Sequence, residues 1–273
     1  MIDRIFFPTP VLSDVVDFYL YYTIDPDQPS IQHYATPVMQ GLVFNFRKQP
    51  QYHSYNGKTF TSRAQAYLFG QCTCPRVVSE DENGAEVLGI KFKPLGISKI
   101  TGINMEHMAN QIVAAEDIWG NEFELLCDEM LSAPSLEKMI AILEKFLIGK
   151  FIHTTLYHRV NNAQNALSLI TSKNGNISVK SLQEQTNTSR KTLERSFMHY
   201  VGIHPKLYTR IVRFNVLKEY MDRNFLDENL TSLALKFGFY DSSHFIAEFK
   251  NFSGTTPTEY LKSKKKLYFS MLV

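Results

Sequence analysis

The chain of 273 residues is poor in cysteine and has no long apolar run. Its three cysteines are too few for a disulfide framework, and their number fits a reducing cytoplasm. No apolar run approaches the roughly 18 residues that span a bilayer. The first residues also lack the basic and apolar segments of a secretory signal. We therefore expect a cytoplasmic protein that does not cross a membrane.

Motifs of common catalytic chemistry are missing as well. The sequence has no glycine-rich phosphate loop, no nucleophile elbow and no zinc-type spacing of cysteine and histidine. We expect no catalytic residue, no metal site and no cofactor, and we expect His33 and His53 to be ordinary hydrogen-bonded residues. Cys72 and Cys74 would share one face of a strand, so a thiol-based redox switch or enzyme domain tethered to helices is the alternative.

Charge is distributed unevenly along the chain, although the formal net charge is only +2. Residues 1–158 contain 12 lysines and arginines and 18 aspartates and glutamates, which gives a net charge of −6. Residues 159–273 contain 17 basic and 9 acidic residues, which gives +8. A basic half joined to an acidic half indicates that the carboxy-terminal half meets a polyanion such as nucleic acid.

The spacing of apolar residues changes near Pro94. Before this residue, segments alternate or are rich in strand-forming residues, whereas the spacing after it is helical. The clearest strand candidates are residues 39–46, 66–72 and 88–93. We predict an α+β domain, a small β-barrel with helices, over residues 1–155, and an all-α domain over residues 156–273.

One predicted helix, capped by Ser135 and running to about residue 152, carries an apolar stripe. The stripe consists of Leu136, Ile140, Leu143 and Leu147. It can pack on its own domain or pair with a second copy of the chain. We expect a homodimer formed through this helix.

The carboxy-terminal half contains an internal repeat. Each unit has a capped helix, a turn, a second helix that glycine closes, and a following proline. The matching pairs are Leu182 and Leu233, Leu193 and Phe245, Phe197 and Phe249, Gly202 and Gly254, Pro205 and Pro257, and Tyr208 and Tyr260. A long helix over residues 205–223 joins the units, so the repeat predicts two helix-turn-helix units.

The repeat resembles the DNA-binding domain of the AraC family of transcription regulators over roughly residues 159–262. The residues that carry this resemblance are Leu233-Ala234-x3-Gly238-Phe239-x-Asp241-x-Ser243-x-Phe245-x3-Phe249-Lys250-x3-Gly254-x2-Pro257-x2-Tyr260. The first unit departs from the family at Gln183, where alanine is usual, and at Asn187, where glycine is usual. The resemblance implies a bacterial regulator, often an activator, that binds double-stranded DNA and acts on RNA polymerase. Its two recognition helices would enter successive major-groove segments on one DNA face.

The helical pattern selects the residues expected to touch DNA. With Leu193 and Phe197 inward, the outward positions of the first recognition helix are Arg190, Lys191, Glu194 and Arg195. Arginine and lysine donate to guanine, and glutamate accepts from cytosine. In the second helix the corresponding positions are Ser242, Ser243, His244 and Ala247, which suit phosphate positioning and shape readout better than base readout. We expect phosphate contacts from Lys206, Arg210 and Lys250. The basic run 262–266 either reaches phosphate or is a solvated tail.

The amino-terminal half resembles an uncharacterised domain that precedes AraC-type DNA-binding domains. The matching residues are Phe69-Gly70, Gly89-Ile90-Lys91-Phe92-Lys93-Pro94-Leu95-Gly96 and Ile118-Trp119-Gly120, within roughly residues 5–150. The broader group uses such domains as small barrels for effector sensing or dimerisation, and the resemblance names no ligand. Abundant aromatic residues either line a pocket for a small-molecule effector or fill a solid core. A domain that serves only for dimerisation or partner docking is a third possibility.

Overall fold

The computed structural model describes residues 4–25, 31–47, 51–55, 58–62, 64–79, 84–151, 157–224 and 229–270. The described strands form two antiparallel sheets. The six-stranded sheet, in the order β1-β2-β9-β4-β7-β10, contains β1 (Arg4–Phe6), β2 (Val16–Ile24), β4 (Gln40–Asn45), β7 (Ala66–Phe69), β9 (Ala85–Phe92) and β10 (Ile112–Ala114). The four-stranded sheet, in the order β3-β8-β5-β6, contains β3 (Ile31–Tyr34), β5 (Gln51–Tyr55), β6 (Lys58–Ser62) and β8 (Arg76–Ser79).

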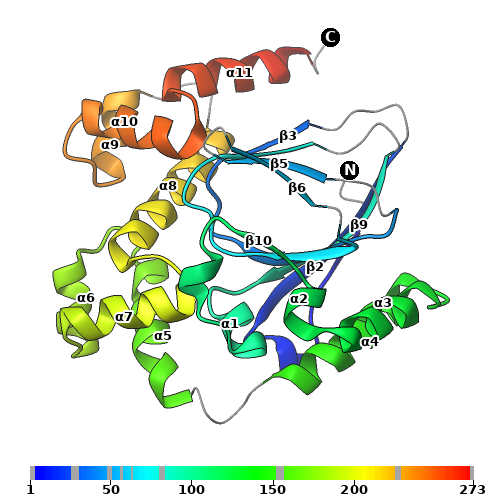
Figure 1. The fold of residues 1–273 in the computed structure, drawn as a ribbon. Helices are drawn as coiled ribbons and strands as arrows, with labels where there is room; N and C mark the ends of the chain where they lie inside the picture. The colour runs from blue at the N-terminus through cyan, green and yellow to red at the C-terminus, as the bar shows by residue number, and fades with distance from the viewer. Residues whose placement is uncertain are drawn as a thin grey trace.

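The two sheets lie face to face and do not join into the closed barrel that the sequence predicted (Figure 1). The α+β class itself is confirmed. Among the described residues, the edge strands β1 and β10 of one sheet form no ladder with the edge strands β3 and β6 of the other, so the barrel stays open. The connection between β3 and β4 crosses from one sheet to the other. It leaves the strand ladder at residues 35–39, where Pro37 has no N–H to donate, and it packs against the carboxy-terminal helices.

The far face of the six-stranded sheet is covered by helices, as Figure 1 shows. These are α1 (Gly96–Thr101), α2 (Glu116–Trp119), α3 (Asn121–Leu131) and α4 (Leu136–Lys150), with the short 3-10 helices η1 (Pro10–Leu12) and η2 (Met105–Met108). The predicted alternation of β9 is confirmed, because Leu88, Ile90 and Phe92 lie in the core shared with α3 and α4. The short β10 was not predicted, since three residues give too little alternation to separate strand from loop.

Helix α4 packs on the six-stranded sheet. Its Ser135 cap is confirmed, since the hydroxyl accepts a hydrogen bond from Lys138 N at 3.3 Å. Leu143 and Leu147 are fully buried in the same core as the sheet. The buried Glu144 also accepts hydrogen bonds from Thr9 N and from the Tyr19 hydroxyl, each at 2.9 Å. The prediction of a dimer through this stripe is therefore wrong, because the apolar face of the sheet already occupies it.

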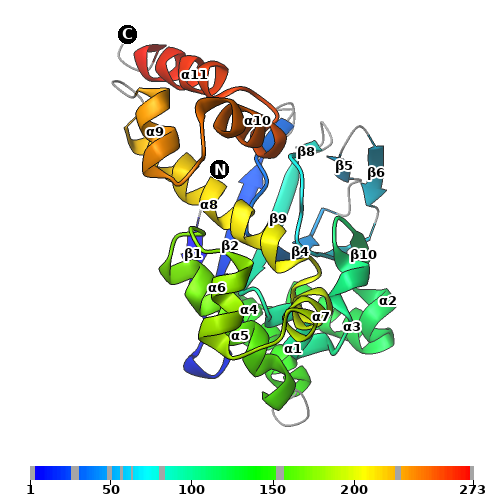
Figure 2. The same cartoon turned by 90° about the vertical axis from the view of Figure 1, so that its left-hand side faces the viewer.

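The carboxy-terminal part is entirely helical. Its helices are α5 (Tyr157–Ser172), α6 (Val179–Thr186), α7 (Arg190–Val201), α8 (Pro205–Arg223), α9 (Leu230–Lys236), α10 (Ser242–Ser253) and α11 (Pro257–Ser270). Both views place α8 between the group α5–α7 and the group α9–α11 (Figures 1 and 2). One apolar core runs through both groups, from Leu182, Leu193 and Phe197 to Phe245, Phe249 and Phe252. The expected boundary near residues 155 and 156 lies outside the described residues.

Local hydrogen bonds explain where these helices begin and turn. Ser178, Ser189, Asn229 and Asp241 each accept a backbone N–H at the start of α6, α7, α9 and α10. The turn of the first unit places Asn187 in the left-handed region, at φ 49°, where asparagine is tolerated better than most residues. Gly238 takes the same role in the second unit, at φ 72°. No helix in the described ranges is long and apolar enough to cross a membrane.

Candidate nucleic-acid interface

Helix α7, the first recognition helix, presents a charged amino-terminal half. Lys191 and Arg195 are exposed, while Leu193 and Phe197 are fully buried beneath them. Arg190 Nε donates to Glu194 Oε1 at 2.9 Å, so these two side chains neutralise one another on the surface. Lys191 and Arg195 are thus the side chains of this face whose positive charge is available to a base or a phosphate.

Helix α10, the second recognition helix, presents a smaller and mostly neutral surface. Ser243, His244 and Ala247 are exposed, and Ser242 is half-buried. The Asp241 carboxylate caps the helix by accepting from His244 N at 2.7 Å. The fully buried Phe245 and Phe249 fix the opposite face. This helix therefore offers short hydrogen-bonding groups and a dipolar amino terminus more than charge.

A polar groove of about 800 Å³ connects the two recognition helices. Its walls include Arg190 and Glu194 of α7, Lys206 of α8 and His244 of α10. The amino-terminal halves of α7 and α10 therefore open onto one common depression of the surface. Two helices that share one face of a domain suit adjacent segments of one DNA face.

The floor of this groove contains a buried carboxylate, Glu248, whose side chain is 2% exposed. Arg210 Nε donates to Oε2 and Arg213 Nη2 donates to Oε1, each at 2.8 Å. The guanidinium of Arg213 also lies 4.4 Å from the centre of the Phe239 ring, and its Nη1 donates to the Gly238 carbonyl. The network joins α8 to α10, so it fixes the second unit on the connecting helix.

Glu248 and Arg213 were missed by the sequence analysis, although a signal was present. Glu248 lies three residues after Phe245, which places it on the buried face of α10. A charged residue on an apolar face needs a buried partner of opposite charge. Arg210, predicted to contact phosphate, is part of this ion pair and its side chain is 37% exposed. Its predicted contact with DNA must therefore compete with Glu248.

The other predicted phosphate contacts lie on the surface. Lys206 and Lys250 are exposed, and Lys206 lines the groove. In the basic run 262–266, Lys262 is exposed, whereas Lys264 pairs with Asp222 at 3.0 Å. The side chains of Lys265, Lys266 and the apolar end that follows lie outside the described residues. Lys264 is thus part of the protein surface, held against α8.

Both recognition helices touch the amino-terminal half at their carboxy-terminal ends. The Gln40 side-chain amide donates to the carbonyl of Val201, the last residue of α7, at 3.3 Å. Thr36 N donates to the carbonyl of Phe252, near the end of α10, at 2.7 Å. Asn215 of α8 donates to the Thr36 carbonyl at 2.9 Å. One short stretch, residues 34–40, therefore holds both recognition helices from behind and leaves their amino-terminal halves open.

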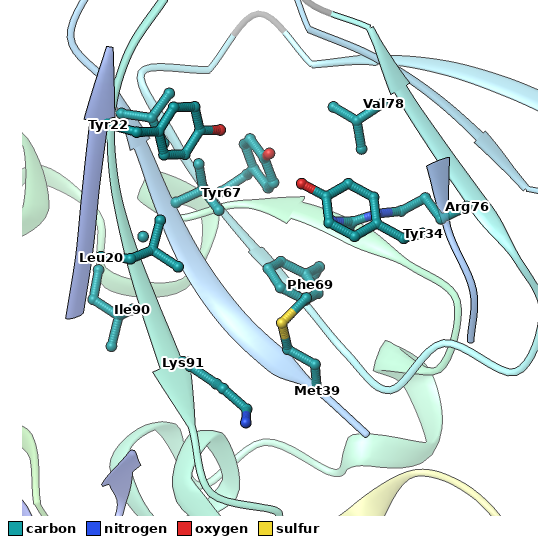
Figure 3. Close-up of a pocket in the computed structure, with 13 residues that line it drawn as sticks. Leu20, Tyr22, Tyr34, Met39, Tyr67, Phe69, Arg76, Val78, Ile90 and Lys91 are labelled. Carbon is teal, nitrogen blue, oxygen red and sulfur yellow. The ribbon is translucent and has the colours of Figure 1, made fainter. Parts of the chain in front are cut away.

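A second cavity, of about 420 Å³, lies between the two sheets of the amino-terminal half (Figure 3). Its walls are mainly apolar and aromatic, with Leu20, Val43, Phe69, Val78 and Ile90 among them. The size and character fit a site for one small molecule. The aromatic residues allowed either a ligand pocket or a solid core, and the structure supports the pocket.

His53 lies fully buried beside this cavity and departs from the expectation of an ordinary hydrogen-bonded residue. Its ring meets Tyr67 edge-on with 5.1 Å between centres. Within the described ranges neither ring nitrogen has a hydrogen-bond partner. Burial, with a smaller contribution from the charge of Arg76, lowers the pKa of His53 from 6.5 to about 3. The ring is therefore neutral at any physiological pH.

We expect His53 to make the fold less stable as the pH falls below 6.5. Between pH 6.5 and 3 the unfolded chain binds a proton at this residue and the native chain does not, so acid favours unfolding. The free energy of unfolding should decrease by about 1.4 kcal/mol per pH unit from this group, or about 2 kcal/mol at pH 5 relative to pH 7. Urea unfolding at both pH values should show a smaller decrease for His53→Phe. Equal decreases for the parent chain and for His53→Phe would contradict the prediction.

Cys72 and Cys74 do not share a strand face as predicted, because β7 ends at Phe69 and both residues follow it in a loop. Both thiols are buried, at 1% and 7% exposure. The described residues contain no cluster of three or more side chains that could hold a metal. Neither thiol is placed where an oxidant or a substrate would reach it without rearrangement of the loop.

Comparison with known families agrees with this geometry. A family model described as a helix-turn-helix domain matches residues 182–263, which include α7, α8 and α10. The matched region contains the AraC-type motif of the second unit. The carboxy-terminal part is an AraC-type DNA-binding domain. Its amino-terminal half matches a domain of unknown function, DUF6597, over residues 4–114. A regulator of this family binds DNA to control transcription.

Solved structures similar to this chain with its AraC-type domain are distant from it in sequence. ToxT from Vibrio cholerae is 15% identical with a TM-score of 0.48, over 89% of this chain and 97% of that one. ToxT bound to an unsaturated fatty acid is 13% identical with a TM-score of 0.48, over 89% of this chain and 94% of that one. A transcriptional regulator from Chromobacterium violaceum is 24% identical with a TM-score of 0.35, over 38% of this chain and 92% of that one. No curated protein matches the sequence. The family assignment rests on the family models, since these TM-scores stay below 0.5.

Proposed function

We propose that this chain regulates transcription from the cytoplasm by binding double-stranded DNA with both helix-turn-helix units, under the control of a small-molecule effector. The observation that carries the DNA-binding half is the common groove onto which the amino-terminal halves of α7 and α10 open. The cavity between the sheets supports the effector. One chain presents two recognition helices, so the proposal does not need a dimer. The regulated partner is RNA polymerase at the promoter.

Roles in DNA binding follow from exposure and charge. Arg195 and Lys191 are the proposed base-reading side chains, because both are exposed cations on the amino-terminal half of α7. Glu194 would accept from cytosine only after leaving Arg190. The remaining predicted contacts are proposed to position the DNA backbone, through phosphate or through the helix amino termini. These residues are Arg190, Lys206, Arg210, Ser242, Ser243, His244 and Lys250.

We expect Arg195→Ala and Lys206→Ala to weaken DNA binding in different ways. Arg195→Ala should cost roughly 1–3 kcal/mol on a selected promoter site and much less on random duplex, because the lost contact is to a base. Lys206→Ala should weaken both DNAs about equally and reduce the slope of log affinity against log salt by about 1. Fluorescence anisotropy of the full chain over a range of salt concentrations measures both effects.

Two outcomes of this experiment would contradict parts of the proposal. Equal losses for Arg195→Ala on promoter and random DNA would assign Arg195 to phosphate contact only. Salt-insensitive binding by the parent chain, or none on any selected promoter fragment, would contradict the DNA-binding function itself.

A further inference from the structure

Tyr240 lies almost entirely in water on the DNA-binding part of the chain. The residue before it, Phe239, is 4% exposed, and the residue after it, Asp241, caps α10, whereas Tyr240 itself is 90% exposed. This is the highest exposed fraction among the large apolar side chains of the described residues. Tyrosine usually buries its ring and leaves only the hydroxyl in water. A single exposed apolar residue is common on protein surfaces, so the position of Tyr240 decides its role.

The turn that presents Tyr240 is anchored on both sides. Gly238 takes φ 72°, and its carbonyl accepts a hydrogen bond from Arg213 Nη1 at 3.2 Å. The Phe239 ring is buried against the same arginine, with its centre 4.4 Å from the guanidinium. On the other side, the Asp241 carboxylate accepts a backbone N–H of α10 at 2.7 Å. Tyr240 is therefore held at the amino-terminal end of α10, the end that opens onto the groove.

The first unit has a different kind of residue at the equivalent position. Both recognition helices begin at a cap, and the residue before the cap is Thr188 in α7 and Tyr240 in α10. Thr188 is only 9% exposed, and its hydroxyl donates to the Thr186 carbonyl at 3.0 Å. The first unit thus keeps this position inside the fold, whereas the second unit presents a large aromatic side chain there.

The two recognition helices also differ in the side chains that they offer to DNA. Helix α7 has two long, exposed cations, Lys191 and Arg195. At the start of α10 the exposed side chains are Ser243 and His244, which are shorter than those cations. Tyr240 supplies the missing reach at this end of α10. Its hydroxyl can donate to a phosphate oxygen, which is a common contact of tyrosine with DNA, while its ring covers the adjoining sugar.

We propose that Tyr240 binds the DNA backbone beside the major groove that α10 enters, with its hydroxyl on a phosphate oxygen and its ring against the deoxyribose. This inference rests on the proposed DNA-binding function and adds a residue to it. The side chain has no positive charge, so its contact releases no counterion from the DNA. Tyr240 thus holds the second unit in place on any sequence and leaves the reading of bases to α7.

The test compares Tyr240→Ala and Tyr240→Phe with the parent chain by fluorescence anisotropy, on a selected promoter fragment and on random duplex. Tyr240→Ala should weaken binding at least about tenfold on both DNAs, because the hydrogen bond and the burial of the ring are both lost. Tyr240→Phe keeps the ring and should weaken binding roughly three- to tenfold. Unlike Lys206→Ala, neither variant should change the slope of log affinity against log salt by more than about 0.3. Parent-like affinity of Tyr240→Ala on both DNAs, or a loss on the promoter fragment alone, overturns the backbone contact.

Tyr52→Ala is the control, because this tyrosine of β5 is 41% exposed in the amino-terminal half. Its DNA affinity should stay within about twofold of the parent. Urea unfolding should give the same midpoint for Tyr240→Ala as for the parent chain, since so little of the ring is buried. A lower midpoint together with weaker binding would attribute the loss to the turn and overturn the direct contact.

Fluorine NMR of the full chain labelled with 3-fluorotyrosine observes the ring itself, and the signal that is missing from Tyr240→Phe assigns it. Promoter DNA should shift this signal, whereas RNA polymerase without DNA should leave it unchanged. A shift with the polymerase and none with DNA would assign the ring to a protein partner and overturn the inference. If the parent chain binds no DNA at all, the proposed function fails; if it binds DNA and both Tyr240 variants bind equally well, only this inference fails.

Discussion

Alanine in place of Gly202 is expected to destabilise the chain by roughly 2–5 kcal/mol and to loosen α7 from the amino-terminal half. Gly202 closes α7 with φ 90°, a left-handed conformation that costs an alanine about 1–2 kcal/mol. A Cβ there would also lie 2.4 Å from the Met105 carbonyl oxygen. This oxygen belongs to the backbone of η2, which cannot move aside as a flexible side chain can. Steric overlap of this kind adds about 1–3 kcal/mol.

The second unit contains a matched control, Gly254. It closes α10 with φ 83°, and the atom nearest to a Cβ there is Pro75 Cγ at 3.7 Å, an ordinary contact. Gly254→Ala should therefore cost only the conformational part, about 1–2 kcal/mol. Urea unfolding gives both losses, and amide hydrogen exchange in residues 105–108 reports the loosened contact. Equal losses for the two variants would show that the Met105 contact does not hold α7 in solution.

The second large effect is expected for Glu248→Gln. This change keeps the shape of the side chain but removes the charge that faces Arg210 and Arg213. Breaking a buried ion pair from one side costs about 3–5 kcal/mol, and here the cost comes mainly from Arg213, whose charge stays largely buried without its partner. Glu194→Gln is the control. Its pair with Arg190 lies at the surface, so the loss should stay below about 1 kcal/mol.

Although Glu248→Gln should destabilise the fold, it should strengthen non-specific binding to DNA. With Glu248 neutral, Arg210 is no longer held by a carboxylate and can reach a phosphate at the edge of the groove. Non-specific affinity should rise, and the slope of log affinity against log salt should steepen by about 1. Anisotropy with random duplex measures this at a temperature where the variant is folded. An unchanged slope would mean that Arg210 does not contact phosphate even when it is released.

Features that depend on neighbouring residues were predictable from the sequence. Ser178, Ser189 and Asn229 cap helices because each side chain reaches an N–H two or three residues away. The alternation of β9 and the internal repeat are local patterns too. They were sufficient to place the two helix-turn-helix units and the exposed face of α7.

Features that depend on distant residues were not predictable. The stripe on α4 has the same sequence signature whether it covers a sheet or a second subunit, and only the position of Leu143 in the core decides. The residues next to Glu248 in the sequence do not indicate that Arg210 and Arg213 are its partners. Residues 35–39 leave the strand ladder to meet helices that follow much later in the chain, and no local pattern indicates those partners.

The hydrogen bonds of Thr36 also have a consequence for synthesis of the protein. Asn215, one of its partners, is 179 positions further along the chain, and Phe252 is further still. At about 5–20 residues per second, the ribosome needs roughly 5–20 s to pass from the end of α4 to the end of α10. The core around Leu143 contains only residues that are synthesised before the carboxy-terminal helices. The surface around Thr36, Gln40 and Leu95, in contrast, is covered only after the last helices have been synthesised. A nascent chain therefore carries an open, partly apolar surface for seconds, and a ribosome that stops before α10 releases a product prone to aggregation.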